Sequence, residues 1–192
     1  MSARLVLMGP PGSGKGTQSA GLAAALGVPA ISTGAIFRDN LARKTELGIE
    51  AERYMSVGDL VPDELTDRLV EARLAEPDAA PGFILDGYPR NMEQVKALDT
   101  MLAKTGKSVD GAILLSIPDD QIVARLLHRA QIEGREDDTE PVIRERIGVY
   151  HSKTEPIVGE FERRGSLHRV DGMGSVEDVA VRLRAAADAA IA

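Results

Sequence analysis

The segment with the clearest chemical content is a glycine-rich loop near the N-terminus, GPPGSGKGT, at residues 9–17. Glycines allow the backbone to turn inward, so that several N–H groups converge on one anion. Lys15 adds a mobile positive charge, and a helix that starts in the loop adds the positive end of its dipole. An apolar segment before the loop and a helical pattern after it favour a nucleoside triphosphate site over a structural turn with a surface lysine. The residues expected to contact the triphosphate are Gly12, Ser13, Gly14, Lys15, Gly16 and Thr17.

The loop also predicts a magnesium site. The strict form of this motif has Ser or Thr directly after the lysine, and here that position is Gly16. Thr17 follows one residue later, so we expect its hydroxyl to lie near the metal ion. Asp86 ends an apolar segment and is expected to hold water around Mg²⁺, the second part of such sites. Mg²⁺ bound with the nucleotide is therefore the expected cofactor.

Two signatures of other triphosphate-binding proteins are missing from the sequence. A guanine-reading Asn-Lys-x-Asp motif is absent, because Leu and Met follow the only asparagines, Asn40 and Asn91. The signature segment of transporter-type ATPases is absent as well. A regulatory GTPase and a transporter ATPase are therefore disfavoured, while a phosphate-loop switch or binding module with slow hydrolysis remains an alternative.

The elements that must position these groups alternate between short apolar runs and longer segments of helical period. Strands are expected at residues 4–8, 28–32, 82–86, 111–117 and 166–171, and helices at 14–26, 64–75, 92–105, 119–130 and 139–164, with a closing helix in the Ala-rich C-terminal tail. Continuous apolar strands separated by helices are typical of a parallel sheet covered on both faces. The sequence therefore predicts a doubly wound α/β fold with a five-stranded parallel sheet. Residues 34–61 contain two short helical patterns and no strand, which predicts a helical insertion beside the core.

Composition narrows the classes of function. The 192 residues fit a single domain with a proper core, since 43% of them are hydrophobic. Lys and Arg number 23 against 30 Asp and Glu, and the resulting net charge of −7 argues against a binder of nucleic acid or anionic membranes. The chain has no cysteine, which excludes disulfides and thiolate metal sites. Without a signal-peptide pattern or an apolar run of membrane-spanning length, we expect a cytoplasmic protein.

Two more motifs begin at predicted carboxyl ends of strands, where parallel sheets bind ligands: ISTGAIFRDN at residues 31–40 and ILDGYPRNMEQ at residues 84–94. Together with the glycine-rich loop and with GDLVPDEL at residues 58–65, they closely resemble the adenylate kinases of the nucleoside monophosphate kinase family. The resemblance covers nearly the whole chain, with four motifs in the same order. It implies a P-loop NTPase fold and a reversible, Mg²⁺-dependent phosphoryl transfer from ATP to AMP that gives two ADP and serves adenine nucleotide homeostasis.

The resemblance also implies an AMP site. Thr33 and Gln94 match positions that select the base, since related pyrimidine monophosphate kinases typically have Ala and Asn there. Arg38 and Arg90 match residues that reach the acceptor phosphate. The positions matched to the AMP site are Thr33, Arg38, Asp59, Leu60, Val61, Gly87, Tyr88, Pro89, Arg90, Gln94, Arg135 and Arg146. A kinase for UMP or CMP is the close alternative, against which Thr33 and Gln94 argue.

The same two motifs also have plain structural interpretations. Either Ser32 or Thr33 is expected to cap the next helix whatever the ligand. The DGYPR segment at residues 86–90 could be an ordinary turn, because Gly and Pro are common in turns. The capping interpretation does not account for Arg38, which lies one helical turn beyond the cap.

Arginines further along the chain supply the positive charge that phosphoryl transfer needs, because negative charge spreads over the migrating group. Arg125 and Arg129 are four residues apart and share one helix face. By the resemblance, Arg125 packs on the ATP adenine, Arg129 contacts ATP phosphates, and Arg135 and Arg146 clamp the transferred group. Each arginine taken singly could be solvated or salt-bridged, and Arg144, outside the matching register, is interpreted in that way. The catalytic set is then Lys15, Arg90, Arg129, Arg135 and Arg146, and the ATP site gains Arg125, Arg129 and Gly174, the last in the turn at residues 170–175.

The resemblance divides a single domain, residues 1–192, into three parts. The core comprises residues 1–31, 62–128 and 138–192. The AMP-binding insertion comprises residues 32–61, and a short lid loop comprises residues 129–137. Many relatives carry a longer lid with four metal-binding cysteines, so the AQIEG connection here implies no structural zinc. ATP, AMP and ADP are the expected partners, with no nucleic acid and no membrane, and a monomer is expected.

A few residues depart from the family pattern or carry no assigned role. Ala35 stands where Asp or Glu is usual, and Tyr88 replaces the commoner Phe. His128, His151 and His168 lack the spacing of metal ligands and are interpreted as structural or solvent-facing.

Overall fold

The computed structural model describes residues 3–135 and 138–192. Its centre is a five-stranded sheet with the strand order β2-β3-β1-β4-β5, in which all neighbouring strands are parallel. The strands are β1 (Arg4–Met8), β2 (Ala30–Ser32), β3 (Phe83–Asp86), β4 (Gly111–Ser116) and β5 (Leu167–Asp171). Each lies within a segment predicted from the sequence, so the doubly wound α/β fold is confirmed.

Helices cover both faces of the sheet, because successive strand side chains point to opposite sides. On one face, Leu5 and Leu7 of β1 pack in a buried cluster with α1 (Lys15–Leu26) and α9 (Val176–Ala190). On the other face, Val6 and Met8 share a cluster with α4 (Asp63–Leu74), α5 (Met92–Ala103) and α8 (Pro156–Arg163). A short 3₁₀ turn, η1 (Pro77–Ala79), leads from α4 towards β3. Burial of apolar side chains on both faces therefore fixes the sheet that carries the strand-end motifs.

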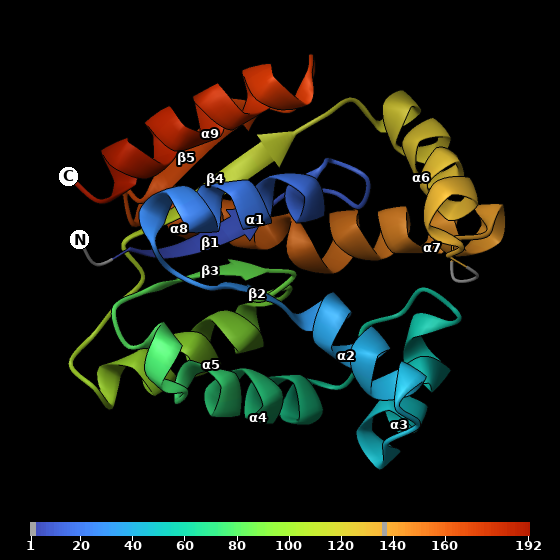
Figure 1. Ribbon diagram of the computed structural model, residues 1–192, viewed down its shortest axis with the longest axis horizontal. Coiled ribbons are helices and arrows are strands. Elements are labelled where there is room, and N and C mark those ends of the chain that lie inside the picture. The colour runs from blue at the N-terminus through green and yellow to red at the C-terminus, as the bar shows by residue number, and fades with distance from the viewer. Residues whose placement is uncertain (1–2, 136–137) are drawn as a thin grey trace.

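The predicted insertion forms a helical hairpin of α2 (Thr33–Ala42) and α3 (Glu46–Met55). It has a small buried cluster of its own, centred on Phe37, Ala51 and Val61. In Figure 1 the hairpin lies beside the end of the sheet to which the strand arrows point, across from α6 (Asp119–Glu133) and α7 (Glu140–Val149). The carboxyl ends of the strands are thus flanked by two helical parts.

Helix α6 continues past residue 130, where the sequence predicted its end, and closes at Gly134. Gly134 has φ 62°, and its backbone N–H donates to the carbonyl of Ala130, a left-handed cap that favours glycine. The first five residues of the predicted lid loop, 129–133, are therefore the last turns of this helix. Residues 136–137 of the predicted lid lie outside the described residues.

The prediction of one helix over residues 139–164 is wrong in its middle. After α7 the chain makes a π-helical turn, η2 (Tyr150–Thr154), before α8 begins. Pro156 has no N–H to donate, so a regular helical ladder cannot pass through it. The N–H of Glu155 instead donates to the carbonyl of Tyr150 at 2.8 Å, which widens the turn.

Within residues 3–135 and 138–192, no helix is both long enough and apolar enough to cross a membrane.

Candidate active site

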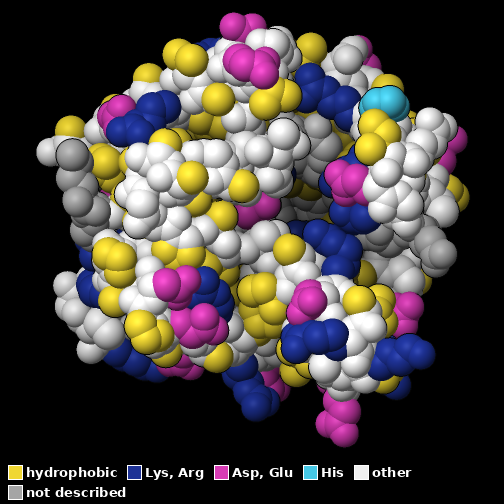
Figure 2. Space-filling model, viewed as in Figure 1, with side chains coloured by type: hydrophobic (Ala, Val, Ile, Leu, Met, Phe, Trp, Pro, Cys, Tyr) yellow, Lys and Arg dark blue, Asp and Glu magenta, His cyan; other side chains and the backbone are white. Residues whose placement is uncertain are grey.

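A cavity of about 920 Å³ opens at the carboxyl ends of the strands and extends from the glycine-rich loop to the hairpin and to α6. Figure 2 shows the hollow right of centre, with Lys and Arg side chains gathered around it. This volume is near the upper end of the range for small-molecule sites. The predicted site residues that line it are Gly12, Ser13, Gly14, Lys15, Gly16, Thr17, Thr33, Arg38, Asp59, Leu60, Val61, Asp86, Gly87, Arg90, Gln94, Arg125, Arg129, Arg135, Arg146 and Gly174.

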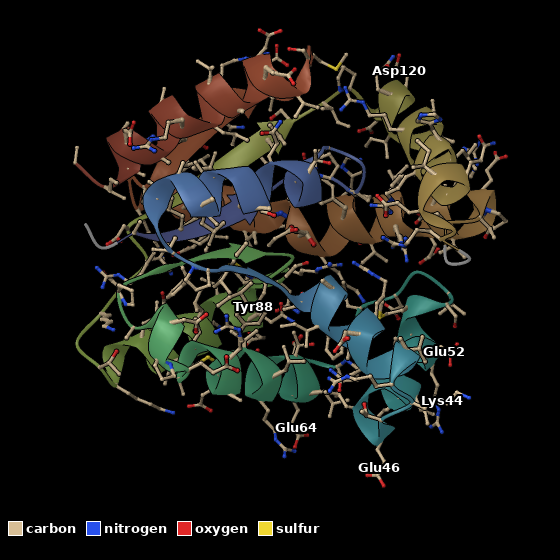
Figure 3. The ribbon with its side chains drawn as sticks, viewed as in Figure 1. Lys44, Glu46, Glu52, Glu64, Tyr88 and Asp120 are labelled. Atoms are coloured by element: carbon tan, nitrogen blue, oxygen red, sulfur yellow. The ribbon has the colours of Figure 1, made fainter. Side chains whose placement is uncertain are left out.

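Two predicted site residues lie apart from this cavity. Pro89 lines a smaller neighbouring cavity of about 100 Å³ that also touches Lys15. Tyr88 is buried in the core cluster on the α4 and α5 side of the sheet (Figure 3), and its hydroxyl donates to Asp67 of α4 at 2.6 Å. The hydroxyl that distinguishes Tyr88 from phenylalanine thus makes a hydrogen bond between two parts of the fold and does not face the cavity.

The Lys15 ammonium is folded back into its own loop. Its Nζ donates to the carbonyl oxygens of Gly9 at 2.7 Å and Pro10 at 2.8 Å, and to Ser13 Oγ at 3.2 Å. Burial, together with the positive charges of Arg90 and Arg129, lowers the pKa of Lys15 to about 8 against the opposing effect of the Asp86 charge. A phosphate bound in the loop would supply the negative charge that this buried ammonium lacks.

Asp86 has the chemistry of a carboxylate that holds a hydrated metal ion. It ends β3 and is only 8% exposed. Among the described residues, no group hydrogen-bonds to its carboxylate. A Cβ placed on Gly16 would lie 4.0 Å from Asp86 Oδ2, so the carboxylate faces the start of α1, where the exposed Thr17 follows. A hard, oxygen-lined site that keeps several waters is the kind that Mg²⁺ prefers, so these residues fit that ion.

No group of three or more His, Cys, Asp or Glu side chains that could hold a metal ion occurs in the part of the chain that the structure describes. His128 lines the cavity, and His151 lies between two carboxylates, Asp119 at 3.0 Å and Glu155 at 2.8 Å.

The carbonyl of Gly87 joins the two strand-end motifs. It accepts hydrogen bonds from Thr33 Oγ1 at 3.0 Å and from Arg90 Nε at 2.7 Å. Ser32, rather than Thr33, caps α2, with its hydroxyl accepting from the N–H of Ala35 at 3.4 Å. Thr33 is therefore released from capping and faces the cavity next to Arg90.

Arg90 is half-buried, and desolvation of its guanidinium lowers its pKa against the raising effect of Asp86. Arg38 lines the same side of the cavity, and a Cβ placed on Gly34 would lie 3.1 Å from its Nη1. The Arg38 guanidinium thus lies over the first turn of α2, as the four-residue spacing from Gly34 allows.

Asp59, Leu60 and Val61 form the return from the hairpin to α4. The Asp59 carboxylate accepts from the N–H of Leu60 at 2.7 Å and from Lys153 of η2 at 3.2 Å. These hydrogen bonds, that of Leu60 first, hold the pKa of Asp59 below its usual range. The end of the hairpin is thus tied to the π-helical turn.

Arg125 lies beside the turn at residues 170–175 that carries Gly174, another predicted residue of the ATP site. Its Nη2 approaches Met173 Sδ at 3.4 Å, and Gly172 and Gly174 line the cavity next to it. A flat guanidinium and a glycine turn across from one another can hold a planar ring between them.

Asp138 gathers three of the predicted arginines, and the sequence interpretation missed it. Its side chain is fully buried; its Oδ2 accepts from Arg129 Nε at 2.7 Å, and its Oδ1 accepts from Arg146 Nη1 at 2.5 Å. Arg135 Nη2 lies 3.9 Å from the same carboxylate. Asp138 ends an acidic run, REDD, which is typical of a solvated surface segment. Only the number of arginines near it in the sequence could have indicated that it pairs with them. In contrast, Arg144 pairs with exposed Glu140, as the sequence predicted.

Comparisons with known proteins agree on one family. The family model described as adenylate kinase matches residues 7–166. The adenylate kinase of Micrococcus luteus is 54% identical over 180 residues, which cover 94% of this chain and 88% of the relative. That of a Nocardioides species is 51% identical over 185 residues, covering 96% and 97%. That of Kocuria rhizophila is 52% identical over 183 residues, covering 95% and 97%.

Proposed function

The chain belongs to the adenylate kinase family, and on that premise we propose that it transfers the γ-phosphoryl group of ATP to AMP, reversibly, giving two ADP. Family membership makes it a phosphotransferase of the nucleoside monophosphate kinase type. The observation that carries the proposal is one cavity that joins the glycine-rich loop to Thr33, Arg90 and Gln94. A triphosphate on the loop and a monophosphate on the far side would meet between them.

The reaction that we propose needs positioning and positive charge more than acid–base chemistry. A phosphate oxygen of AMP attacks the γ-phosphorus, the bond to the β,γ-bridging oxygen breaks, and ADP leaves with that oxygen. The acceptor phosphate has a second pKa of about 6, so its attacking oxygen is already deprotonated at neutral pH. No general base is required.

Cations around the cavity are suited to the charge of the migrating group. In this proposal Lys15 and Arg129 meet the triphosphate and Arg90 meets the acceptor phosphate, and all three side chains line the cavity. Asp138 holds Arg129 and Arg146 as a pair, so that their guanidinium groups are oriented before any ligand binds. Mg²⁺, which Asp86 and Thr17 would hold through water, supplies further charge on the triphosphate when bound.

The base of the acceptor is the finer part of the proposal. Gln94 presents an amide in the cavity, and Thr33 a hydroxyl, at the positions where pyrimidine monophosphate kinases typically have Asn and Ala. Amide and hydroxyl groups can pair with the donor and acceptor atoms along an adenine edge. AMP is therefore preferred over UMP and CMP as the acceptor.

A substrate panel tests the proposal. ADP formation from Mg·ATP is measured with AMP, UMP, CMP and GMP in turn, for the wild type, Arg146→Ala and Arg144→Ala. We expect fast turnover with AMP alone, a large loss in Arg146→Ala, and wild-type turnover in Arg144→Ala, whose arginine is paired on the surface. Turnover with UMP or CMP would overturn the base assignment, and ADP formation that does not depend on any acceptor would overturn the reaction.

The proposal extends to a monomer that acts in the cytoplasm and balances adenine nucleotide pools. Light scattering at the protein concentrations used for kinetics checks the first part. A mass of one chain is expected, and a mass of two chains would contradict it.

A further inference from the structure

The side-chain amide of Gln94 is held from both ends. Its Oε1 accepts from the backbone N–H of Arg90 at 2.7 Å, and its Nε2 donates to Asp63 Oδ1 at 2.7 Å. A backbone N–H can only donate and an ionised carboxylate can only accept, so together they fix which end of the amide is oxygen. Gln94 is 2% exposed, so little water is available to replace either partner.

Asp63 serves this contact through a small network. It is the first residue of α4 and does not line the cavity. Its carboxylate also accepts from Asn91 Nδ2 at 2.9 and 3.1 Å. Asn91 in turn caps α5, with its Oδ1 accepting from the N–H of Gln94 at 2.9 Å. The carboxylate therefore fixes both the backbone and the side chain of Gln94 without reaching a ligand.

The orientation of this amide decides which purine it can read. As held, Gln94 keeps one lone pair on Oε1 and one N–H on Nε2, a pair that matches the 6-amino group and the adjacent ring nitrogen of adenine. The flipped amide would match a 6-oxo purine, which presents an acceptor at position 6 and an N–H beside it. In the flipped state Oε1 would face the Asp63 carboxylate and Nε2 would face the Arg90 N–H, so both anchors would be lost.

We propose that Asp63 is a specificity-determining positioning residue, which makes the acceptor site select a 6-amino over a 6-oxo purine by fixing the Gln94 amide. This inference rests on the proposed function, because it assumes that Gln94 meets the acceptor base. The inference adds to the proposed function the residue that sets the orientation of the Gln94 amide, a residue that does not itself line the cavity.

The test compares kcat/KM for AMP and for IMP, which differ at position 6 and in the ring proton beside it. The variants are Asp63→Ala, which removes the anchor, and Asp63→Asn, whose own amide can offer either oxygen or N–H to Gln94. Glu64→Gln is the matched control, since it removes the neighbouring charge of α4 from a side chain that points into solvent (Figure 3).

We expect the AMP-to-IMP ratio to fall about tenfold or more in Asp63→Ala, less in Asp63→Asn, and not at all in Glu64→Gln. A merely structural loss would lower both rates together and leave the ratio unchanged. An AMP-to-IMP ratio within twofold of wild type in Asp63→Ala would overturn the inference. If the alanine variant fails to fold, the same result in Asp63→Asn would overturn it. Absence of AMP phosphorylation by the wild type would instead overturn the proposed function, so the two failures are distinct.

Discussion

The guanidinium of Arg129 donates to the buried carboxylate of Asp138 across 2.7 Å, and this contact joins the end of α6 to the segment that leads into α7. Arg146 of α7 donates to the other oxygen of the same carboxylate. Two cations that would repel one another are thus held together at the cavity by one anion. The arrangement is prepared before a phosphoryl group arrives to take their charge.

Replacing Asp138 with Asn should therefore impair catalysis more than binding. The variant keeps the shape of the side chain but loses the charge that pairs Arg129 with Arg146. We expect kcat at saturating nucleotide to fall about tenfold or more, with smaller changes in KM. Asp99→Asn is the control, because Asp99 pairs with Arg164 on the surface away from the cavity. A kcat within twofold of wild type in Asp138→Asn would contradict a role in holding the arginines.

From the lowered pKa of Lys15 we expect the protein to take up a proton when a triphosphate binds. In the free protein its pKa is lowered to about 8, mainly by burial, and a bound polyanion would raise it. Below this pKa the lysine is already charged, so its charge makes its full contribution to triphosphate affinity. As pH rises through it, binding must recruit a proton, so affinity falls until the raised pKa of the complex is passed.

Calorimetric titration with a non-hydrolysable ATP analogue measures this uptake. At about pH 8.5, the apparent enthalpy should vary with the ionisation enthalpy of the buffer. Lys15→Arg should abolish the variation, because arginine stays charged. A wild-type enthalpy independent of the buffer would show that the lysine does not change protonation.

Gly87 should tolerate no side chain. Its φ is 80°, and a Cβ would lie 2.9 Å from Arg90 Nη2 and 3.1 Å from Thr33 Oγ1. Gly87→Ala is expected to displace both groups and to lower ADP-forming activity about tenfold or more. Gly106→Ala is the matched control, since Gly106 has φ 67° and nothing within 4 Å. It should cost about 1 kcal/mol of unfolding free energy through backbone strain alone and keep its activity. Equal activity losses in the two variants would rule out displacement as the cause.

His151 should stabilise the fold in a pH-dependent way. The hydrogen bond to Glu155, aided by that to Asp119, raises the pKa of His151 against the opposing effect of burial, and the Tyr150 ring packs beside it in an edge-to-face arrangement. Its stabilising contribution is complete below the ordinary histidine pKa of about 6.5 and is lost as pH rises through the raised folded-state value.

Because His151 is partly exposed, the contribution should be at most about 1 kcal/mol. Urea unfolding of the wild type and of His151→Gln, at about pH 5.5 and about pH 9, measures it. The two proteins should differ at the lower pH and converge at the higher one. An equal difference at both values would show that the charge of His151 makes no contribution.

The sequence predicts the centre of the sheet well because β1, β3 and β4 are almost wholly buried and appear as nearly continuous apolar runs. β1 is the clearest case: Leu5 and Leu7 face one layer and Val6 and Met8 the other, so no polar residue interrupts the run. Helix ends are predicted less well. The π-helical turn follows from how Pro156 is accommodated, and the apolar period alone does not encode it.

The phosphate loop could be predicted from residue types, whereas the arginine positions depended on the resemblance. Asp138 and Asp63 could not be found in either way. The partners of Asp63 are 28 and 31 residues away in sequence, and its position at a helix start is already explained by the helix dipole. Asp138 lies in an acidic run of surface type, and only packing reveals that its side chain is buried.

The most direct test of the central claim uses ATP with a labelled γ-phosphate, Mg²⁺ and AMP, followed by separation of the products. Transfer between the two sides of one cavity predicts that the label appears as the β-phosphate of ADP and that its appearance requires AMP. Label released as inorganic phosphate at a rate independent of AMP would contradict the account, and would make the protein a triphosphate hydrolase or switch.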